Sequence, residues 1–478
     1  MRDRILVIQL ARLGDLVQTV PFLKDLRHNY QDSRIALLCQ KKLVPLARMI
    51  EGLDEVIPFP LDDFLSSPDD RGGTIPHLWD FLRPLFQQKY PMVLNLNYSL
   101  ISALAAEGLC EPQGEIIGNF LGADGRVLKR SSWFNFIGSF SSRRRLNPFN
   151  LVDVFRYLIP GERNELYPML RLDNENPWHR RSDKPLVVFL LGAGAKKRQW
   201  PVFNFVKLAK LLQKKTGVII ALVGSKKERA LSRIFARRST ADFVDLVGKL
   251  DLVELCRVLK EACLVIGSDT GPLHLAAALN TRTLGLYFGP AWVHETGPYG
   301  EGHTVFQVDV PCGPCLDRGI CKEYLCRKVI TPDLVAPKAI ELITGEKTED
   351  PPIPDSLHLY VSQSDGKTTR YIKKRGNKAE SDTQVVRNIY RYLASRFFHF
   401  PDQEKQASLG NTGGLVKDIT YALYCLNHDY LGFSVGPFFE PWIRFVYSYR
   451  DTREEIRGML TAGFDSVFEY LKDSANPF

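Results

Sequence analysis

Short apolar runs alternate with segments of helical spacing along most of the 478-residue chain. In parallel α/β proteins such runs are buried strands, and the segments between them are the crossover helices. The predicted strands are Ile5–Leu10, Ile35–Cys39, Pro91–Asn97, Leu186–Leu191, Val218–Val223, Val244–Leu246, Cys263–Gly267 and Thr283–Phe288. The predicted helices include a segment ending near Asn29, one from Leu43, Val202–Lys215 and Leu252–Glu261. The pattern therefore predicts doubly wound sheets.

Polar stretches divide this pattern into domains. We expect a first α/β domain over residues 1–172, a linker at Asp173–Lys184 and a second α/β domain over residues 185–346. Residues Lys347–Asp355 form a further linker rich in Pro, Asp and Glu. Residues 356–478 begin with a segment typical of a β-hairpin and continue with helical spacing. They predict an additional, mostly α-helical domain, to which the pattern assigns no role.

One strand–turn–helix–strand unit, Val265–Gly289, carries the strongest chemical signal. The turn contains Asp269, Thr270 and Gly271, and the helix begins near Pro272. A helix start at the carboxyl edge of a parallel sheet binds anions through free N–H groups. Asp269 or Thr270 can cap the helix, so a plain capped turn is an equal alternative. His274 on the first helical turn favours the anion site, because it adds a titratable donor.

Three further segments carry candidate chemistry in the same kind of position. Asp15 follows the first strand and is either a helix cap or a catalytic base. The loop containing Lys197 and Arg198 precedes a predicted helix and favours phosphate binding. Gly224 and Ser225 end another strand, and Glu228 is either a ribose ligand or a surface residue.

The formal net charge of +9 favours acidic partners such as a sugar nucleotide, a phosphorylated glycolipid or a membrane surface. No zinc-finger, helix-turn-helix or lysine-rich arm indicates nucleic acid. Arg126, Arg143 and Arg144 lie in a basic stretch that is either a solvated face or a site for an anionic acceptor. No segment is typical of a signal peptide or a membrane span. We therefore predict a cytoplasmic protein with peripheral contact at the inner face of the inner membrane.

Four of the nine cysteines, Cys312, Cys315, Cys321 and Cys326, cluster within fifteen residues. Clustered cysteines flanked by Pro and Gly are typical of a structural zinc or iron site, although the gap between the pairs is short for a zinc ribbon. Free thiols are the equal alternative. The other cysteines lie mostly in apolar segments and are predicted to be core residues.

Three segments together resemble glycosyltransferase family 9, the ADP-heptose:lipopolysaccharide heptosyltransferases. They are RLGDLVQTVPFLKDLR (Arg12–Arg27), the loop KKRQWP and SDTGPLHLAAAL (Ser268–Leu279). The resemblance extends from about Ile5 to Gly345. It implies a GT-B fold, in which two Rossmann-like domains face a central cleft, with the acceptor mainly on the first domain and the nucleotide sugar mainly on the second.

The resemblance also implies roles for single residues. Asp15 matches the proposed catalytic base, and Thr270 and Gly271 match the residues whose backbone holds the donor diphosphate, with Asp269 and His274 beside them. Arg198 occupies a position near Trp200 where family members often have a phosphate-binding lysine. No DxD-like carboxylate pair accompanies these residues, so the predicted reaction requires no catalytic metal or other cofactor.

The predicted function is inverting transfer of a heptose or related sugar from ADP-heptose or a similar nucleotide sugar to a lipopolysaccharide core or related glycan. Two alternatives remain open at this point. One is transfer to a protein acceptor, and the other is a non-catalytic sugar-nucleotide-binding protein of the same fold. The presence of Asp15 favours an enzyme over the second alternative.

Overall fold

The computed structural model of the chain describes residues 3–61, 81, 83–122, 125–142, 144–167, 169–172, 184–315, 321, 324–349, 351–376, 387 and 391. Two compact units result from the internal contacts, and each is described by itself. The first unit comprises residues 1–131 and 150–377 and contains both sheets. The second comprises residues 132–149 and 378–478. Most of residues 378–478, for which the sequence predicts a mostly helical domain, lie outside the described residues, as does the predicted linker from residue 173 to 183.

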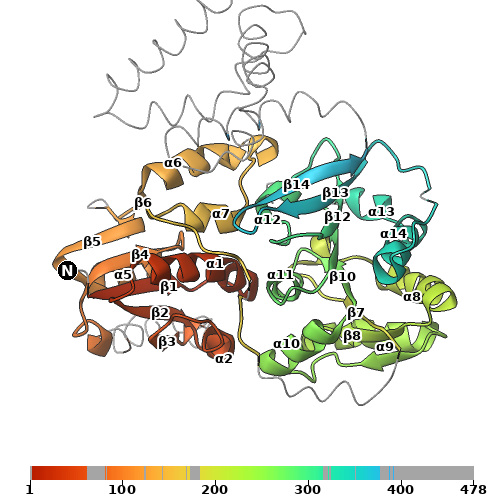
Figure 1. Ribbon diagram of the computed structural model, residues 1–478, viewed down its shortest axis with the longest axis horizontal. Coiled ribbons are helices and arrows are strands. Elements are labelled where there is room, and N and C mark those ends of the chain that lie inside the picture. Colours follow the sequence, from red (N-terminus) through yellow and green to blue (C-terminus); the bar gives the residue numbers. More distant parts are fainter. Residues whose placement is uncertain are drawn as a thin grey trace, which may run out of the picture. The chain divides into compact units, whose positions relative to one another are not determined.

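The first sheet has six strands in the order β3-β2-β1-β4-β5-β6 (Figure 1). Their bounds are β1 Arg4–Gln9, β2 Arg34–Gln40, β3 Glu55–Phe59, β4 Tyr90–Asn95, β5 Cys110–Leu121 and β6 Val127–Arg130. All neighbours are parallel except β5 and β6. The helices of this part are α1 Leu13–Asn29, α2 Val44–Ala47, α5 Leu100–Leu109 and α7 Leu151–Arg156, with the 3-10 turn η1 Lys41–Leu43. The central strands are apolar on both faces, as expected for a parallel sheet covered on both sides.

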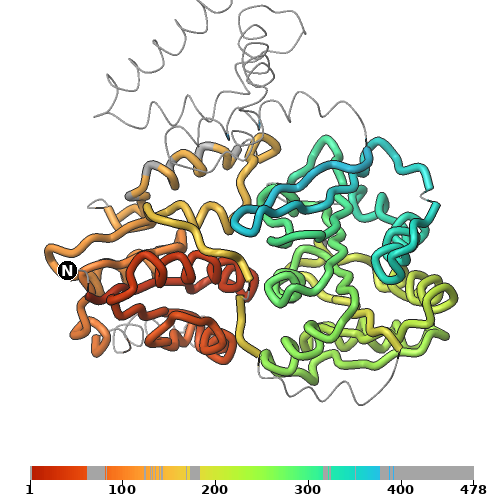
Figure 2. The backbone as a smooth tube through the Cα atoms, viewed as in Figure 1, coloured from red at the N-terminus to blue at the C-terminus, as the bar shows by residue number. Residues whose placement is uncertain are grey.

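The second sheet has eight strands in the order β14-β13-β12-β11-β10-β7-β8-β9. Their bounds are β7 Leu186–Leu190, β8 Ile219–Val223, β9 Phe243–Asp245, β10 Leu264–Ser268, β11 Thr283–Tyr287, β12 Thr304–Val308, β13 Leu357–Ser364 and β14 Thr369–Arg375. The helices and 3-10 turns are η4 Lys196–Arg198, α8 Val202–Thr216, η5 Lys226–Glu228, α9 Arg229–Arg238, α10 Leu252–Glu261, α11 Gly271–Ala278, α12 Val293–Thr296, α13 Cys326–Val329 and α14 Pro332–Thr344. Figure 2 shows that each sheet comes from one continuous stretch of chain. The predicted α/β class with two parallel-dominated sheets is confirmed.

The hairpin β13–β14 extends the second sheet. β13 pairs antiparallel with β12, from Val308↔Leu357 to Thr304↔Val361. Residue 356, where we placed the start of a third domain, is thus the last residue before a strand of this sheet. The apolar residues Leu357 and Leu359 explain the difference, because they are buried in the core of the second sheet.

Buried polar contacts join the two α/β halves of the first unit. Arg156 on α7 is 1% exposed and binds the carboxylate of Asp25 on α1, in the same half, through two nitrogens at 2.6 and 2.8 Å. Its Nη1 also donates to the carbonyl of Lys367, between β13 and β14 in the other half. The hydroxyl of Tyr299, which follows β11 and α12, donates to Asp153 on α7. The hydroxyl of Tyr167 donates to the carbonyl of Ala277 on α11 at 3.0 Å. These contacts hold α1 close to α11, which positions the site described below.

Candidate active site

The first element of the site is the start of α1. Arg12 is the N-cap residue and Asp15 lies in the first turn of the helix. Asp15 Oδ2 accepts a hydrogen bond from the N–H of Arg12 at 3.0 Å. Burial raises the pKa of Asp15 above its ordinary value of 3.8, opposed by this N–H and by the nearby His274 and Arg12 side chains. Asp15 thus contributes to the helix cap and is also a half-buried carboxyl group, so the cap and the base do not exclude each other.

The second element is the start of α11. Thr270 is its N-cap residue, with extended backbone angles of φ −148° and ψ 157°, and no side chain caps the helix. Among the described residues the buried hydroxyl Oγ1 of Thr270 has no hydrogen-bond partner. Thr270 thus occupies the predicted cap position, but its side chain makes no capping hydrogen bond. Asp269 is engaged elsewhere: its Oδ1 lies 3.2 Å from His274 Nε2, and its Oδ2 accepts from Arg198 Nη1 at 3.4 Å.

The two helix starts are in direct contact. A Cβ atom added to Gly271 would lie 2.9 Å from Cβ of Leu13 and 3.0 Å from the backbone nitrogen of Gly14. A Cβ atom added to Gly14 would lie 3.2 Å from Cδ2 of His274. Glycine at both positions therefore lets α1 and α11 approach at backbone distance. This contact brings Asp15 within electrostatic range of His274.

Two arginines converge beside these helix starts. A Cβ atom added to Gly194 would lie 2.7 Å from Nη2 of Arg198 and 3.3 Å from Nη1 of Arg12. Nε of Arg198 and Nδ1 of His274 are buried, and neither has a hydrogen-bond partner in the part of the chain that the structure describes. Two like charges side by side, with unpartnered buried donors, favour an anion between them.

Arg12 is the site residue that the sequence reasoning missed. It belongs to the segment RLGD, which we used only for the family resemblance. Its position three residues before Asp15 was the signal in the sequence that could have identified it as a site residue. The sequence could not show that its guanidinium extends toward Gly194, because that loop lies in the other half of the unit.

Glu228 lies at the end of β8 beside two glycines. Its Oε2 accepts from the N–H and the hydroxyl of Ser225, both at 2.7 Å, so it belongs to a capping box. Added Cβ atoms at Gly192 and Gly224 would lie within 2.8 and 3.0 Å of the Glu228 side chain. These glycines make room for the carboxylate at the carboxyl edge of the sheet. Lys197 lies in η4 next to Arg198, and its side chain lies outside the described residues.

The predicted acceptor residues Arg126, Arg143 and Arg144 stay a prediction. Arg126 is exposed before β6, Arg144 lies in the 3-10 turn η3 (Arg144–Leu146) of the second unit, and Arg143 is outside the described residues. The second unit also contains α6 (Ser132–Gly138) and η2 (Ser139–Ser142). Buried aromatic rings pack within this segment: the ring centroids of Trp133 and Phe149 lie 5.1 Å apart, and those of Phe136 and Phe140 lie 5.4 Å apart.

The four clustered cysteines lie around Gly289, directly after β11. Cys315 N–H donates to the Gly289 carbonyl at 2.9 Å, and burial raises the pKa of the Cys326 thiol, with Cys312 and Cys321 nearby. Cys312 and Cys321 are exposed. Among the described residues no three His, Cys, Asp or Glu side chains are placed to hold a metal ion. Zinc or iron at these cysteines stays a prediction.

Two sheets of Rossmann type, with a site at the contact of their helix starts, define a GT-B protein. Residues 163–324 match the family described as glycosyltransferase family 9 (heptosyltransferase). Over these residues the chain is similar to the heptosyltransferases of glycosyltransferase family 9.

Individual relatives agree with this assignment. The chain is 26% identical over 322 residues to lipopolysaccharide heptosyltransferase 2 of Escherichia coli, covering 64% of this chain and 88% of that protein. It is 26% identical over 179 residues to lipooligosaccharide heptosyltransferase 2 of Campylobacter jejuni, covering 36% of this chain and 56% of that protein. The chain thus spans only about half the length of the first curated relatives that it matches.

A solved structure shows the same fold. The ADP-heptose lipopolysaccharide heptosyltransferase II of E. coli superimposes with a TM-score of 0.53 at 20% identity, covering 72% of this chain and 99% of that one. No helix among the described residues has the length and apolarity to cross a membrane.

Proposed function

We propose that the chain transfers a heptose or related sugar from ADP-heptose or a similar nucleotide sugar to a glycan of the lipopolysaccharide core. The names of its relatives support this choice of donor and acceptor. The juxtaposition of Asp15 with Arg198, His274 and the start of α11 supports the chemistry. Such a site contains one carboxylate for a proton and several donors for phosphate oxygens.

In the proposed reaction Asp15 is the general base. It accepts the proton of an acceptor hydroxyl while that oxygen attacks the anomeric carbon of the donor sugar. The bond from the anomeric carbon to the diphosphate oxygen breaks in the same step. Because this is a direct displacement from the opposite side, the configuration at the anomeric carbon inverts. A raised pKa brings Asp15 closer to the pH at which it works, which makes it a stronger base than an ordinary aspartate.

The donor diphosphate is proposed to bind at Thr270, Gly271 and Arg198. The start of α11 has no side-chain cap and is therefore open to an external anion. Arg198 is held by Asp269, which also contacts His274. These groups stabilise the negative charge that develops on the leaving diphosphate. Glu228, at the edge formed by Gly192 and Gly224, is proposed to accept from the ribose hydroxyls of the nucleotide.

The observation that carries the proposal is the contact between the Asp15 and His274 segments, which come from different halves of the unit. The direct test is incubation of the purified chain with ADP-heptose and heptose-deficient lipopolysaccharide core, followed by mass spectrometry of the glycan. A mass increase of one heptose is expected, and it should be lost with Asp15→Asn. If the chain binds ADP tightly but transfers no sugar from ADP-heptose or from other nucleotide sugars, the non-catalytic alternative would be favoured.

A further inference from the structure

The helices α8 and α9 have an unusual charge composition. Together they contain eight lysines and arginines and no aspartate or glutamate. The stretch from residue 202 to 238 carries ten basic residues against the single acid Glu228, which equals the +9 formal charge of the whole chain. The remainder of the chain is therefore neutral in sum. We call the eight cations of the two helices the α8–α9 basic surface: Lys207, Lys210, Lys214, Lys215, Arg229, Arg233, Arg237 and Arg238.

These eight side chains are all exposed. The helices follow the consecutive parallel strands β7 and β8, so their right-handed crossovers place both on the same face of the sheet (Figure 1). Lys207 forms an ion pair with Asp333 on α14. None of the other seven has a carboxylate partner in the described part of the chain. The charge of this surface is thus almost uncompensated.

An exposed aromatic residue continues the basic surface along α8. Phe203, Lys207, Lys210 and Lys214 follow the spacing i, i+4, i+7, i+11, which places them on one stripe of the helix. All four are exposed, and Phe203 is 58% exposed. A large apolar side chain beside lysines is typical of a surface that lies in the headgroup region of a bilayer.

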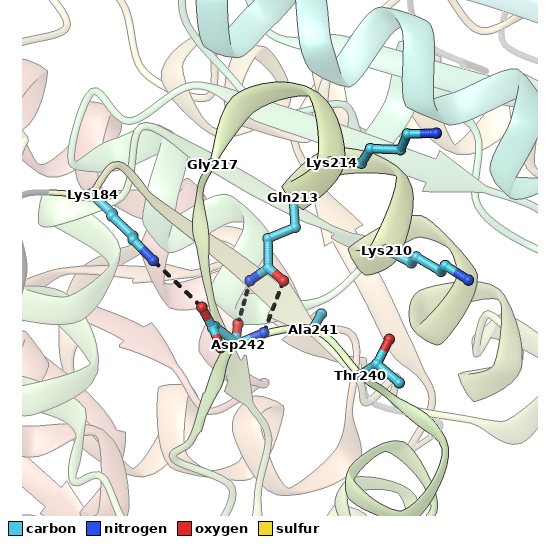
Figure 3. A pocket seen from close by; sticks show the side chains of 8 residues that line it. All are labelled: Lys184, Lys210, Gln213, Lys214, Gly217, Thr240, Ala241 and Asp242. Carbon is cyan, nitrogen blue, oxygen red and sulfur yellow. Dashed lines mark hydrogen bonds and ion pairs between the residues drawn. The ribbon is translucent and has the colours of Figure 1, made fainter.

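A concave site lies at the end of the same stripe. A cavity of about 350 Å³ is lined by Lys184, Lys210, Lys214 and Asp242, among others. Lys184 pairs with Asp242 at 3.4 Å, whereas the ammonium groups of Lys210 and Lys214 extend away from Asp242 (Figure 3). Three cations against one carboxylate leave this concavity positive, which suits an anionic headgroup.

We infer that the α8–α9 basic surface docks the protein on a membrane that contains anionic phospholipids. The uncompensated charge supplies long-range attraction, and Phe203 supplies an apolar contact at the interface. The single exposed aromatic side chain does not provide the repeated stacking platform that single-stranded nucleic acid uses. The inference stands on these charges and does not depend on the proposed reaction.

The test is co-sedimentation of the full chain with vesicles of phosphatidylethanolamine alone or with phosphatidylglycerol added. Binding to the anionic vesicles is expected, and it should fall as salt rises, because the attraction is screened. A variant with Lys210→Gln, Lys214→Gln, Arg233→Gln and Arg237→Gln should bind several-hundredfold more weakly, about 600-fold if each surface cation contributes roughly fivefold. The matched control carries Lys41→Gln, Arg48→Gln, Lys347→Gln and Lys374→Gln, four exposed cations outside α8 and α9. It should lose much less.

Phe203→Ala separates insertion from charge. It should weaken vesicle binding by a factor that depends little on salt, because an apolar contact is not screened. Circular dichroism and ADP binding of each variant verify that it is folded. Equal vesicle binding by the α8–α9 variant and its control would overturn the inference. The inference would also be overturned if the α8–α9 variant lost binding to duplex DNA while its binding to vesicles stayed unchanged. Failure of the transfer assay would leave either result interpretable, because vesicle binding is measured without substrate.

Discussion

The helix starts of α1 and α11 touch each other, yet they satisfy their backbone N–H groups differently. At α1 the carboxylate of Asp15 accepts from the N–H of Arg12, so the helix provides its own anion. At α11 no side chain caps the helix, and the nearby carboxylate of Asp269 binds Arg198 and His274. The first helix start thus holds a base, whereas the second is open to a ligand.

This difference separates the expected effects of substitutions at the two helix starts. A change at the start of α1 should act mainly on the chemical step, because Asp15 is needed when the acceptor hydroxyl loses its proton. A change around α11 should act mainly on nucleotide affinity, because phosphate oxygens are bound there before reaction. The five predictions below test this division, from the largest effect to the smallest.

Asp15→Asn should lower the rate of transfer by about 10²–10⁴-fold, the usual cost of losing a general base. ADP affinity should stay within a few-fold of the wild type, since the amide does not touch the diphosphate site. Steady-state kinetics and calorimetric titration of ADP measure the two quantities. Asp32→Asn, an exposed aspartate, is the control and should change neither. Unchanged turnover of Asp15→Asn would disprove the assignment.

Arg198→Ala should weaken ADP binding by roughly tenfold to a hundredfold, because a charge-assisted contact to phosphate contributes about 1.5–3 kcal/mol. The loss should shrink as salt rises, since part of the attraction is screened. Titration of ADP at two ionic strengths checks this. Lys196→Ala, an exposed neighbour in η4, serves as the matched control. Equal losses in the two variants would place the diphosphate elsewhere.

Gly271→Val should also weaken ADP binding, by about tenfold, but through packing. Its Cβ would press on Leu13 and Gly14, and such overpacking costs about 1–3 kcal/mol. The two helix starts would have to separate, and the added side chain would block a phosphate from the backbone. The effect should therefore be nearly independent of salt, in contrast to Arg198→Ala. A loss that disappears at high salt would contradict this explanation.

Arg12→Gln should weaken ADP binding by a smaller factor, about three- to tenfold, because Arg198 remains to bind the phosphate. The double variant with Arg198→Ala sharpens the comparison. If both guanidiniums contact one diphosphate, the two losses should be non-additive. Strict additivity in calorimetric titrations would mean that Arg12 and Arg198 act on different groups.

Asp15→Asn should slightly stabilise the fold at neutral pH. Burial raises the pKa of Asp15 in the folded chain, so the folded state holds this proton more tightly than the unfolded state does. Ionisation therefore lowers the free energy of unfolding as pH rises from the ordinary value of 3.8 through the raised pKa, and the penalty is constant above it. Denaturant unfolding of the wild type and the variant across this pH range should show that the free energy of unfolding of Asp15→Asn increasingly exceeds that of the wild type as pH rises. If the wild type instead became more stable than the variant as pH rises, the raised pKa of Asp15 would be contradicted.

Local pattern was enough to place most elements of the two sheets. The helix predicted at Leu252–Glu261 has these same bounds, and the strand predicted at Leu186–Leu191 differs by one residue. The reason is that burial on both faces makes a parallel strand continuously apolar, and this is visible in the sequence itself. The turn at Asp269–Gly271 was also recognisable, because its residue types suit a helix start at a sheet edge.

Long-range packing decided the rest. Only the fold shows that Asp269 does not cap α11, because its carboxylate accepts from Arg198, which lies 71 residues earlier in the chain. The same holds for the hairpin β13–β14, whose apolar residues fit the edge of the second sheet. The sequence by itself determined which segments form strands, helices and an anion-binding turn, because these depend on neighbouring residues. The tertiary structure decided that Arg12 and Asp15 meet Arg198 and His274, because only the packing of Gly14 against Gly271 brings these two halves of the chain to backbone distance.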